Sequence, residues 1–344
     1  DTYGFPVELT AEIAAGRGLS VDLAGFEKAM EKQRKRARAA HKFAGVLEGA
    51  AGLETQLDIE ETPFVGYHDL EHKSVIIGLL VDGQAVQTVA EGQEAGLILE
   101  TTPFYAEMGG QVGDTGAVSG ASGRFSVSDT VRMPPDITVQ QGRVAEGSLA
   151  VGDEVEAKVD EERRLDITRN HTATHLLQLA LRQVLGRHVE QKGSLVAPER
   201  LRFDFSHLTA VMPEQLEEVQ HIVNEKIRQN LMVRSEETPY QQAIREGAIA
   251  LFDEKYGDTV RVLKIGDPAV SVELCGGTHV AATGEIGMLR IMPISPAKVV
   301  SAADCAVLKL LQAEKSSHSW SNNSPLYWKL PGRWIPQQTM LVVR

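Results

Sequence analysis

The sequence predicts an α+β protein with a helical amino-terminal segment, a small β-barrel and a mixed α+β domain that binds a metal ion. Charged and alanine-rich residues of helical character fill about the first 50 positions. Short β-rich runs separated by glycine and proline pairs follow to about residue 160, as in small barrels. Helical and strand patterns then alternate, and two clusters of histidine and cysteine lie among them. We therefore expect domains at residues 1–50, 51–160 and 161–292, and a tail at 293–344.

The composition is ordinary for a globular protein. The chain has 344 residues, a formal net charge of −12 and only two cysteines, which excludes a disulfide framework and favours the cytoplasm. It has no long apolar stretch and no signal peptide, so we expect neither membrane insertion nor export. Because it begins at Asp1 without methionine, we expect a fragment of a longer protein.

The helical segment at residues 1–50 is basic near its end. Ser20 and Asp22 are candidate caps of a helix that extends to about His41. Seven lysines and arginines stand against two glutamates between residues 26 and 42. A solvated helix face is the simpler interpretation of this charge alone. The other is contact with nucleic-acid phosphates, for which the candidate residues are Lys32, Arg34 and Arg36.

The barrel at residues 51–160 is predicted from β-rich runs bounded by turn residues. These runs are Ser74–Val81, Leu97–Thr102, Arg124–Val131 and Val155–Val159. The glycine-rich segment Phe104–Gly116 is not a phosphate loop, because no Gly-Lys-Ser/Thr follows and no helix opens there. We expect it to be a close-packed turn region, and we find no nucleotide site in this sequence.

The mixed domain at residues 161–292 is predicted from two helical and three strand patterns. The helices would run from near Thr168 to near Gly186 and from Pro213 to Asn230. The strands would be Leu201–Phe205, Val260–Ile265 and Val270–Leu274.

The two clusters in this domain have the composition and spacing of a metal site. His171 and His175 are four residues apart on the first helix and therefore share one face. Cys275 and His279 enclose two glycines, which allow the backbone to fold tightly around an ion. Thiolate and imidazole ligands favour zinc over magnesium or calcium.

A third histidine pair serves as a comparison. His68 and His72 have the same spacing, but no cysteine lies near them and a strand pattern follows. We expect both to be solvated loop residues.

Four motifs in this order resemble the editing domain of alanyl-tRNA synthetase, which also occurs in free-standing editing proteins. They are Arg169–Leu177 (RNHTATHLL), Gln191–Ser194 (QKGS), Leu201–His207 (LRFDFSH) and Cys275–Val280 (CGGTHV). The segment Phe104–Gly116 resembles the β-barrel that precedes this domain, and Asp1–Pro6 (DTYGFP) resembles the end of the helical tRNA-recognition region. The resemblance covers roughly residues 1–291 and points to a fragment of the synthetase.

The resemblance implies one zinc ion at His171, His175, Cys275 and His279, and a pocket residue at Gln191. It implies hydrolysis of serine or glycine wrongly esterified to alanine tRNA, with mischarged alanine tRNA as the partner. A pocket for alanine rejects serine or glycine weakly, so a second hydrolytic site must supply the discrimination. Ligation of alanine with ATP and Mg²⁺ would lie upstream of Asp1.

The residues leave the mechanism open. Four protein ligands fill a tetrahedral shell, whereas a catalytic zinc usually keeps one position open; either His279 stays loose, or the metal orients the substrate while a separate water attacks. The hydroxyls of Thr172, Thr174 and Thr278 can recognise serine or simply pack in a helix and a turn. The alternative function is a structural zinc module that binds tRNA without catalysis. A metallopeptidase is disfavoured, because Thr172 stands where such enzymes have glutamate.

The tail at residues 293–344 departs from the family pattern. A segment rich in glycine and paired arginines, followed by a dimerising helical region, would be expected after Ile291. Instead, proline-containing segments follow, and all three tryptophans lie in this tail. We expect a truncated or frame-shifted end, disordered after about residue 315, without the oligomerisation region.

Overall fold

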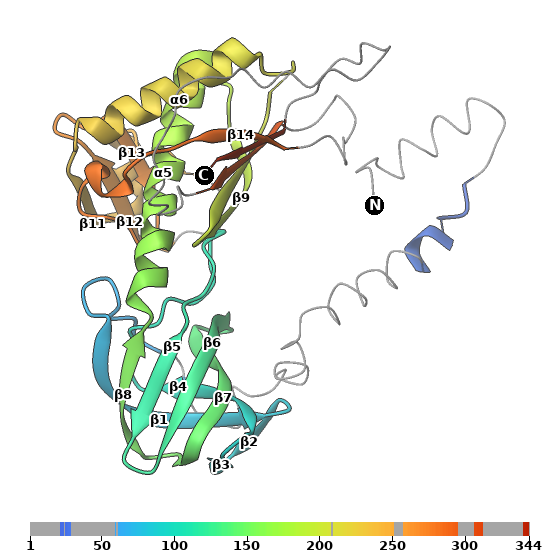
Figure 1. The fold of residues 1–344 in the computed structure, drawn as a ribbon, viewed down its shortest axis with the longest axis vertical. Helices are drawn as coiled ribbons and strands as arrows, with labels where there is room; N and C mark the ends of the chain where they lie inside the picture. The colour runs from blue at the N-terminus through green and yellow to red at the C-terminus, as the bar shows by residue number, and fades with distance from the viewer. Residues whose placement is uncertain are drawn as a thin grey trace, which may run out of the picture. The chain divides into compact units, whose positions relative to one another are not determined.

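The computed structural model describes residues 21–23, 25–28, 59, 61–207, 209–250, 257–294, 306–311 and 340–343. The chain divides into two compact units (Figure 1). The first comprises Asp1–Met108 and Val112–Arg164, and the second comprises Gly109–Gln111 and Leu165–Arg344. The short segment Gly109–Gln111 therefore belongs with residues that follow it by more than fifty positions.

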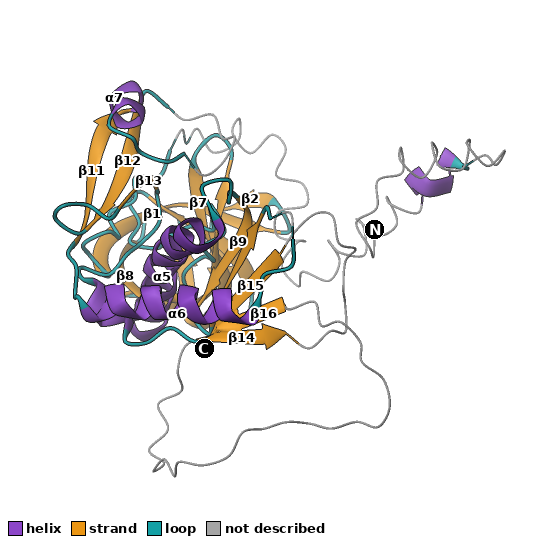
Figure 2. Cartoon of the chain, turned by 90° about the horizontal axis from the view of Figure 1, so that it is seen from above, coloured by secondary structure: helices purple, strands orange, loops and turns teal. Residues whose placement is uncertain are grey.

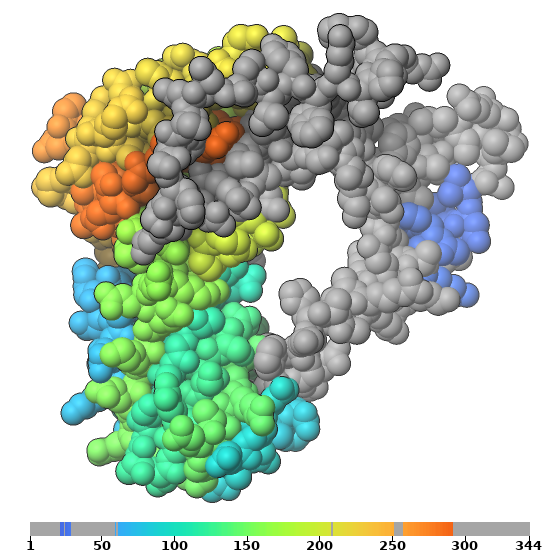
Figure 3. Space-filling view, in the orientation of Figure 1, coloured from blue at the N-terminus to red at the C-terminus, as the bar shows by residue number. Residues whose placement is uncertain are grey.

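The first unit contains a closed barrel of antiparallel strands. Its six strands follow one another in the order β1 (Glu71–Val81), β4 (Glu94–Leu99), β7 (Ile137–Ala150), β6 (Gly123–Met133), β5 (Gly116–Gly120) and β8 (Glu154–Val159). Pairing of β8 with β1 closes the ring, and two short strands pair on its outside, β2 (Gln84–Val86) with β1 and β3 (Thr88–Ala90) with β7. The space-filling view shows the barrel strands as a continuous surface (Figure 3). The predicted barrel is confirmed.

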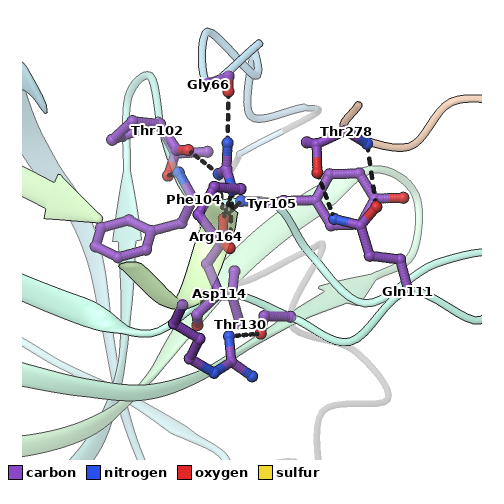
Figure 4. Close-up of polar contacts among 12 residues, drawn as sticks. Gly66, Thr102, Phe104, Tyr105, Gln111, Asp114, Thr130, Arg164 and Thr278 are labelled. Atoms are coloured by element: carbon purple, nitrogen blue, oxygen red, sulfur yellow. Dashed lines mark hydrogen bonds and ion pairs between the residues drawn. The ribbon is translucent and has the colours of Figure 1, made fainter. Parts of the chain in front are cut away.

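The barrel interior is largely apolar, and the first unit also contains a buried ion pair. Alternating side chains of every barrel strand fill the core. Arg164 donates to the carboxylate of Asp114, and the two side chains are only 4% and 1% exposed. Arg164 also donates to the carbonyl oxygens of Gly66 and Pro103, at 2.6 and 2.9 Å (Figure 4). This network holds the glycine-rich segment in place, because Asp114 lies within that segment.

The glycine-rich segment Phe104–Gly116 is packed as closely as predicted. A Cβ at Gly113 would overlap the carbonyl oxygen of Thr130, and one at Gly110 would overlap Ser194. No helix begins within this segment, all of which the structure describes.

The second unit combines helices with two separate sheets. One sheet has the order β14 (Ile291–Ile294), β16 (Met340–Val343), β15 (Ala306–Leu311), β10 (Arg200–Phe205) and β9 (Gln191–Ala197). The other has the order β11 (Val233–Pro239), β12 (Thr259–Ile265) and β13 (Ser271–Leu274). The helical elements are α5 (Glu161–Leu185), α6 (Pro213–Arg228), α7 (Tyr240–Arg245) and the 3-10 turn η1 (Thr283–Ile286).

Helices α5 and α6 cross against the sheets (Figures 1 and 2). One face of α6 buries Leu216, Val219, Val223 and Ile227 in a single core with α5, β10 and β12. This face has the 3.6-residue periodicity that predicted the helix. Complete burial of Phe203 and Phe205 of β10 in the same core contributes roughly 1.5–3 kcal/mol for each side chain.

Helix α5 begins earlier than the predicted start near Thr168. Asp160 lies just before its first residue, and its carboxylate accepts a hydrogen bond from the backbone N–H of Arg163 at 3.1 Å. Two glutamates in the first turn favour the same start. The longer helix places His171 and His175 in its middle rather than near its amino-terminal end.

The predicted loop position is wrong for one of the comparison histidines. His68 lies in an exposed turn, as predicted. His72 lies in β1, half-buried, with its Nε2 atom 2.9 Å from the hydroxyl of Thr101. The strand begins at Glu71 because His72 pairs with Ala157 of β8, a partner that the local pattern does not reveal.

Parts of the predicted organisation lie outside the described residues. Most of the helix to His41 is among them, including Lys32, Arg34 and Arg36. Asp22 acts as predicted, because its carboxylate accepts a hydrogen bond from the N–H of Gly25 at 2.8 Å. Most of residues 293–344 also lies outside, although β15 and β16 pair with β10 and β14. Among the helices that the structure describes, none has the length and apolar character needed to cross a membrane.

Candidate metal centre

The two predicted pairs of ligands meet at one point in the second unit. The ligand atoms of His171, His175, Cys275 and His279 all lie within 4.8 Å of one another. The Sγ atom of Cys275 lies 3.4 Å from Nε2 of His171 and 3.3 Å from Nε2 of His279. The middle of α5 supplies the first pair, and the loop after β13 supplies the second. The residues brought together are thus the four that the sequence predicted.

Each of the three histidines makes a hydrogen bond through its Nδ1 atom, on the side of the ring away from the other candidate ligands. His171 donates to Oε1 of Gln111 at 2.7 Å, and His175 donates to the carboxylate of Glu273 at 2.7 Å. His279 faces the hydroxyl of Thr172 at 3.3 Å. Because that hydroxyl donates its own proton to the carbonyl oxygen of Thr168 at 2.9 Å, it accepts one from His279.

These contacts assign the same tautomer to all three rings. A proton on Nδ1 leaves the lone pair of Nε2 directed towards the other ligands. The Nε2 atom of His175 is buried without a hydrogen-bond partner among the described residues. A buried polar nitrogen without a partner is costly whether or not it carries a proton, and a metal ion would displace that proton and bind the lone pair. The donor set of one thiolate and three imidazoles therefore fits zinc.

Burial and charge give the four ligands unequal proton affinities. Burial lowers the pKa of His279 to about 3. Burial also acts to lower the pKa of His175, but the charges of Glu273 and Cys275 outweigh it and raise this pKa to about 10. Burial disfavours the thiolate of Cys275, yet the neighbouring His171, His279 and His175 bring the pKa of the thiol well below its usual range. The cluster thus stabilises a thiolate, the form that binds metal.

The loop that carries Cys275 and His279 has no room for larger residues. A Cβ at Gly277 would overlap the ring of His171 and lie 2.9 Å from Oε1 of Gln111. Arg261 of β12 donates to the carbonyl oxygen of Gly277 at 2.6 Å. The glycine identified from the sequence is therefore required for close approach of the backbone.

Gln111 joins the loop to the glycine-rich segment. Its side chain is 0% exposed. Its Oε1 atom accepts from the N–H of Thr278 at 3.0 Å, and its Nε2 atom donates to the hydroxyl of Thr278 at 2.9 Å (Figure 4). The adjacent Gly110 accepts a hydrogen bond from the N–H of Val196 in β9 at 2.7 Å. The segment thus links β9 to the metal loop.

The other predicted site residues lie at different distances from the ligands. Thr172 and Thr278 are buried and contact the ligands or their partners. Gln191 is half-buried at the start of β9, opposite Phe205. The described hydrogen bonds to the Nδ1 atoms of His171, His175 and His279 come from Gln111, Glu273 and Thr172, not from Gln191.

Sequence reasoning missed Gln111 and Glu273. A polar residue within a run of glycines and an acidic residue in an otherwise apolar strand, SVEL, are the signals that point to them. Neither signal identifies the partner histidine, because Gln111 is 60 residues from His171 and Glu273 is 98 residues from His175.

The chain matches two described families along its length. Residues 1–163 match the family described as tRNA synthetases class II (A). Residues 260–322 match the family described as the threonyl and alanyl tRNA synthetase second additional domain. The second match includes Cys275 and His279 and continues beyond Ile291, where the resemblance recognised in the sequence ends.

Curated relatives agree with these matches. The chain is 55% identical over 295 residues to an alanine–tRNA ligase of Dehalococcoides mccartyi, a match that covers 85% of this chain and 34% of the relative. It is 53% identical over 302 residues to that of Chloroflexus aurantiacus (85% and 34%) and 51% identical over 292 residues to that of Methylococcus capsulatus (85% and 33%). The chain thus spans about a third of the length of these relatives. With identity above 50% across 85% of its residues, the chain belongs to the alanine–tRNA ligase family.

Proposed function

We propose that this chain binds one zinc ion and hydrolyses serine wrongly esterified to alanine tRNA, as the editing part of an alanine–tRNA ligase. The observation that carries the proposal is the convergence of three Nε2 atoms and one thiol, with each histidine oriented through Nδ1. Family membership supports tRNA as the partner. We assign the ligation of alanine, with ATP and Mg²⁺, to a part of these ligases outside this chain.

Such an activity is needed because binding alone discriminates poorly between alanine and the similar amino acids serine and glycine. Serine differs from alanine by one hydroxyl and glycine by one methyl group, and a small apolar pocket discriminates against such changes by only about 1–3 kcal/mol. A second site that recognises the serine hydroxyl removes the wrong ester after it forms. Glycine is a further substrate of this proposal.

The zinc ion, when bound, would polarise the ester carbonyl, orient the amino group or lower the pKa of a water. The protein's own hydroxyls differ in what they can still donate. Thr172 uses its proton on the carbonyl oxygen of Thr168. Thr278 accepts from Gln111 and retains a proton with which to bind the serine side chain. Of the two threonines, Thr278 is therefore the better candidate for recognition.

Zinc content is the first test. We expect one zinc ion per chain by elemental analysis of the purified protein, and loss of that zinc in Cys275→Ala. The matched control is Cys305→Ala, which removes the other cysteine of the chain and should leave zinc bound. If Cys275→Ala retained zinc, the cysteine would not be a ligand.

Deacylation is the second test. The chain should cleave seryl ester from alanine tRNA, spare alanyl ester and lose activity when a chelator removes zinc. Gln191→Ala should slow cleavage by about tenfold or more without releasing zinc, because an unpaired polar group in a pocket costs about 1–3 kcal/mol. Gln183→Ala, which changes an exposed glutamine of the same unit, should have no effect. A chain that binds zinc and tRNA but cleaves nothing would instead be a structural tRNA-binding module.

A further inference from the structure

The carboxylate of Glu273 lies next to the candidate metal centre. Glu273 is only 1% exposed to solvent. It lies in β13, a strand whose other residues are serine, valine and leucine. One oxygen accepts from Nδ1 of His175 at 2.7 Å, and the other accepts from the hydroxyl of Ser271 at 2.6 Å. Both oxygens are thus engaged, so the geometry is specific rather than incidental.

A buried carboxylate is expensive unless an opposite charge compensates it. Zinc with one thiolate and three neutral imidazoles would carry a net charge of about +1, from the charges of the free ion and its ligands. The carboxylate of Glu273 would reduce this charge to about zero. Gln111 and Thr172, which hold the other two histidines, are uncharged and cannot do so.

We propose that Glu273 is a positioning residue of the metal centre, which both orients His175 and balances the charge of the bound ion. The inference rests on the zinc binding proposed above. His175 differs from the other two histidines in having an ionised partner, and a carboxylate acceptor makes an imidazole a stronger metal ligand. The positive charge of the bound ion would in turn offset the cost of burying the carboxylate of Glu273 in an apolar core.

Two substitutions at this position separate orientation from charge. Glu273→Gln keeps an oxygen that can accept from Nδ1 of His175 but removes the charge, whereas Glu273→Ala removes both. Zinc affinity, measured by competition with a chromophoric chelator, should fall by about 10–100-fold in Glu273→Gln and further in Glu273→Ala. The matched control is Ser271→Ala, which removes the neutral hydrogen bond to the same carboxylate and should weaken zinc binding less than Glu273→Gln.

Cobalt substitution and circular dichroism complete the experiment. The thiolate-to-cobalt absorption of Glu273→Gln should match that of the unchanged chain once the ion is saturating, because Cys275 remains a ligand. Circular dichroism should show that the metal-free variant is folded. The inference is wrong if folded Glu273→Gln binds zinc as tightly as the unchanged chain, or if Ser271→Ala loses as much affinity. An unchanged chain that binds no zinc would overturn the proposed function together with this inference.

Discussion

Gly277 shows how strictly the metal loop depends on a single missing side chain. The backbone at this position passes so close to His171 that even a methyl group would overlap the imidazole. The constraint is one of space, and the neighbouring atoms belong to a ligand and to its partner Gln111, both buried. A buried ring held by a 2.7 Å hydrogen bond cannot move aside without losing its orientation.

Gly277→Ala should therefore damage the centre without touching a ligand. We expect zinc affinity to fall by at least about tenfold and the free energy of unfolding to fall by about 1–3 kcal/mol, the usual cost of overpacking. Chelator competition and denaturant unfolding would measure the two effects. Gly257→Ala is the control, because its nearest neighbour would be the carbonyl oxygen of Thr259 at 3.8 Å. Equal behaviour of the two variants would show that the loop can relax.

Among the helices and strands, α5 carries His171 and His175 and fixes these two candidate ligands in register. Its start depends on Asp160, whose carboxylate caps the first turn at the N–H of Arg163. A cap outside the helix affects the candidate ligands indirectly, because Thr168, which supports Thr172, lies about two turns beyond the first residue of the helix. We therefore expect the cap to contribute to stability and not to metal affinity.

Asp160→Ala should lower the free energy of unfolding by about 1 kcal/mol, within the range of 0.5–2 kcal/mol known for cap removal. Asp160→Asn retains a capping oxygen and should lose little. Urea titrations of both variants with zinc bound would measure the difference. A large drop in zinc affinity for Asp160→Ala would show instead that the helix unwinds as far as the ligands.

The elements that could be predicted are those in which the buried residues are apolar and recur at the period of a strand or a helix. Strands β6, β8, β10 and β12 and helix α6 have apolar residues at the expected period and were all recognised in part or whole. Strand β7 was missed, because it buries Gln140 and Gln141. The amide of Gln140 donates to the hydroxyl of Thr102 at 3.0 Å, so its burial depends on a distant partner and not on its own character.

The same distinction applies to the site. The convergence of His171, His175, Cys275 and His279 could be predicted, because each pair is local and the amino acids are of the kinds that bind zinc. Gln111 and Glu273 could not, because their partners are brought to them only by the complete fold. Gln191, Thr172 and Thr278 remain proposals as catalytic residues.

At the scale of the whole molecule, charge is unevenly distributed along the chain. The net charge is −12, yet seven basic residues cluster between positions 26 and 42. Lys32, Arg34 and Arg36 are the residues proposed to contact tRNA phosphates. Each phosphate contact releases counterions, so binding through this cluster would depend strongly on salt.

Lys32→Glu, Arg34→Glu and Arg36→Glu together should weaken tRNA binding and reduce the slope of log affinity against log salt by about 2, at 0.7–0.9 for each lost contact. Filter binding over a range of salt concentrations would measure both. The control is the same reversal at three exposed arginines of the second unit, Arg228, Arg245 and Arg290. If the first triple variant behaves like the control, the cluster is a solvated helix face.

The distance in sequence between Gln111 and Thr278, 167 residues, has a consequence for the order in which the molecule is made. Chains are synthesised at about 5–20 residues per second, and domains fold as units during synthesis. Gln111 would therefore leave the ribosome about 10–30 s before the loop that it must hold. The barrel strands up to Val159 can pair in that interval, whereas Cys275 and His279 are the last two of the four candidate ligands to emerge. During translation His171 and His175 are therefore present before Cys275 has been synthesised, in a nascent chain whose second unit is still incomplete.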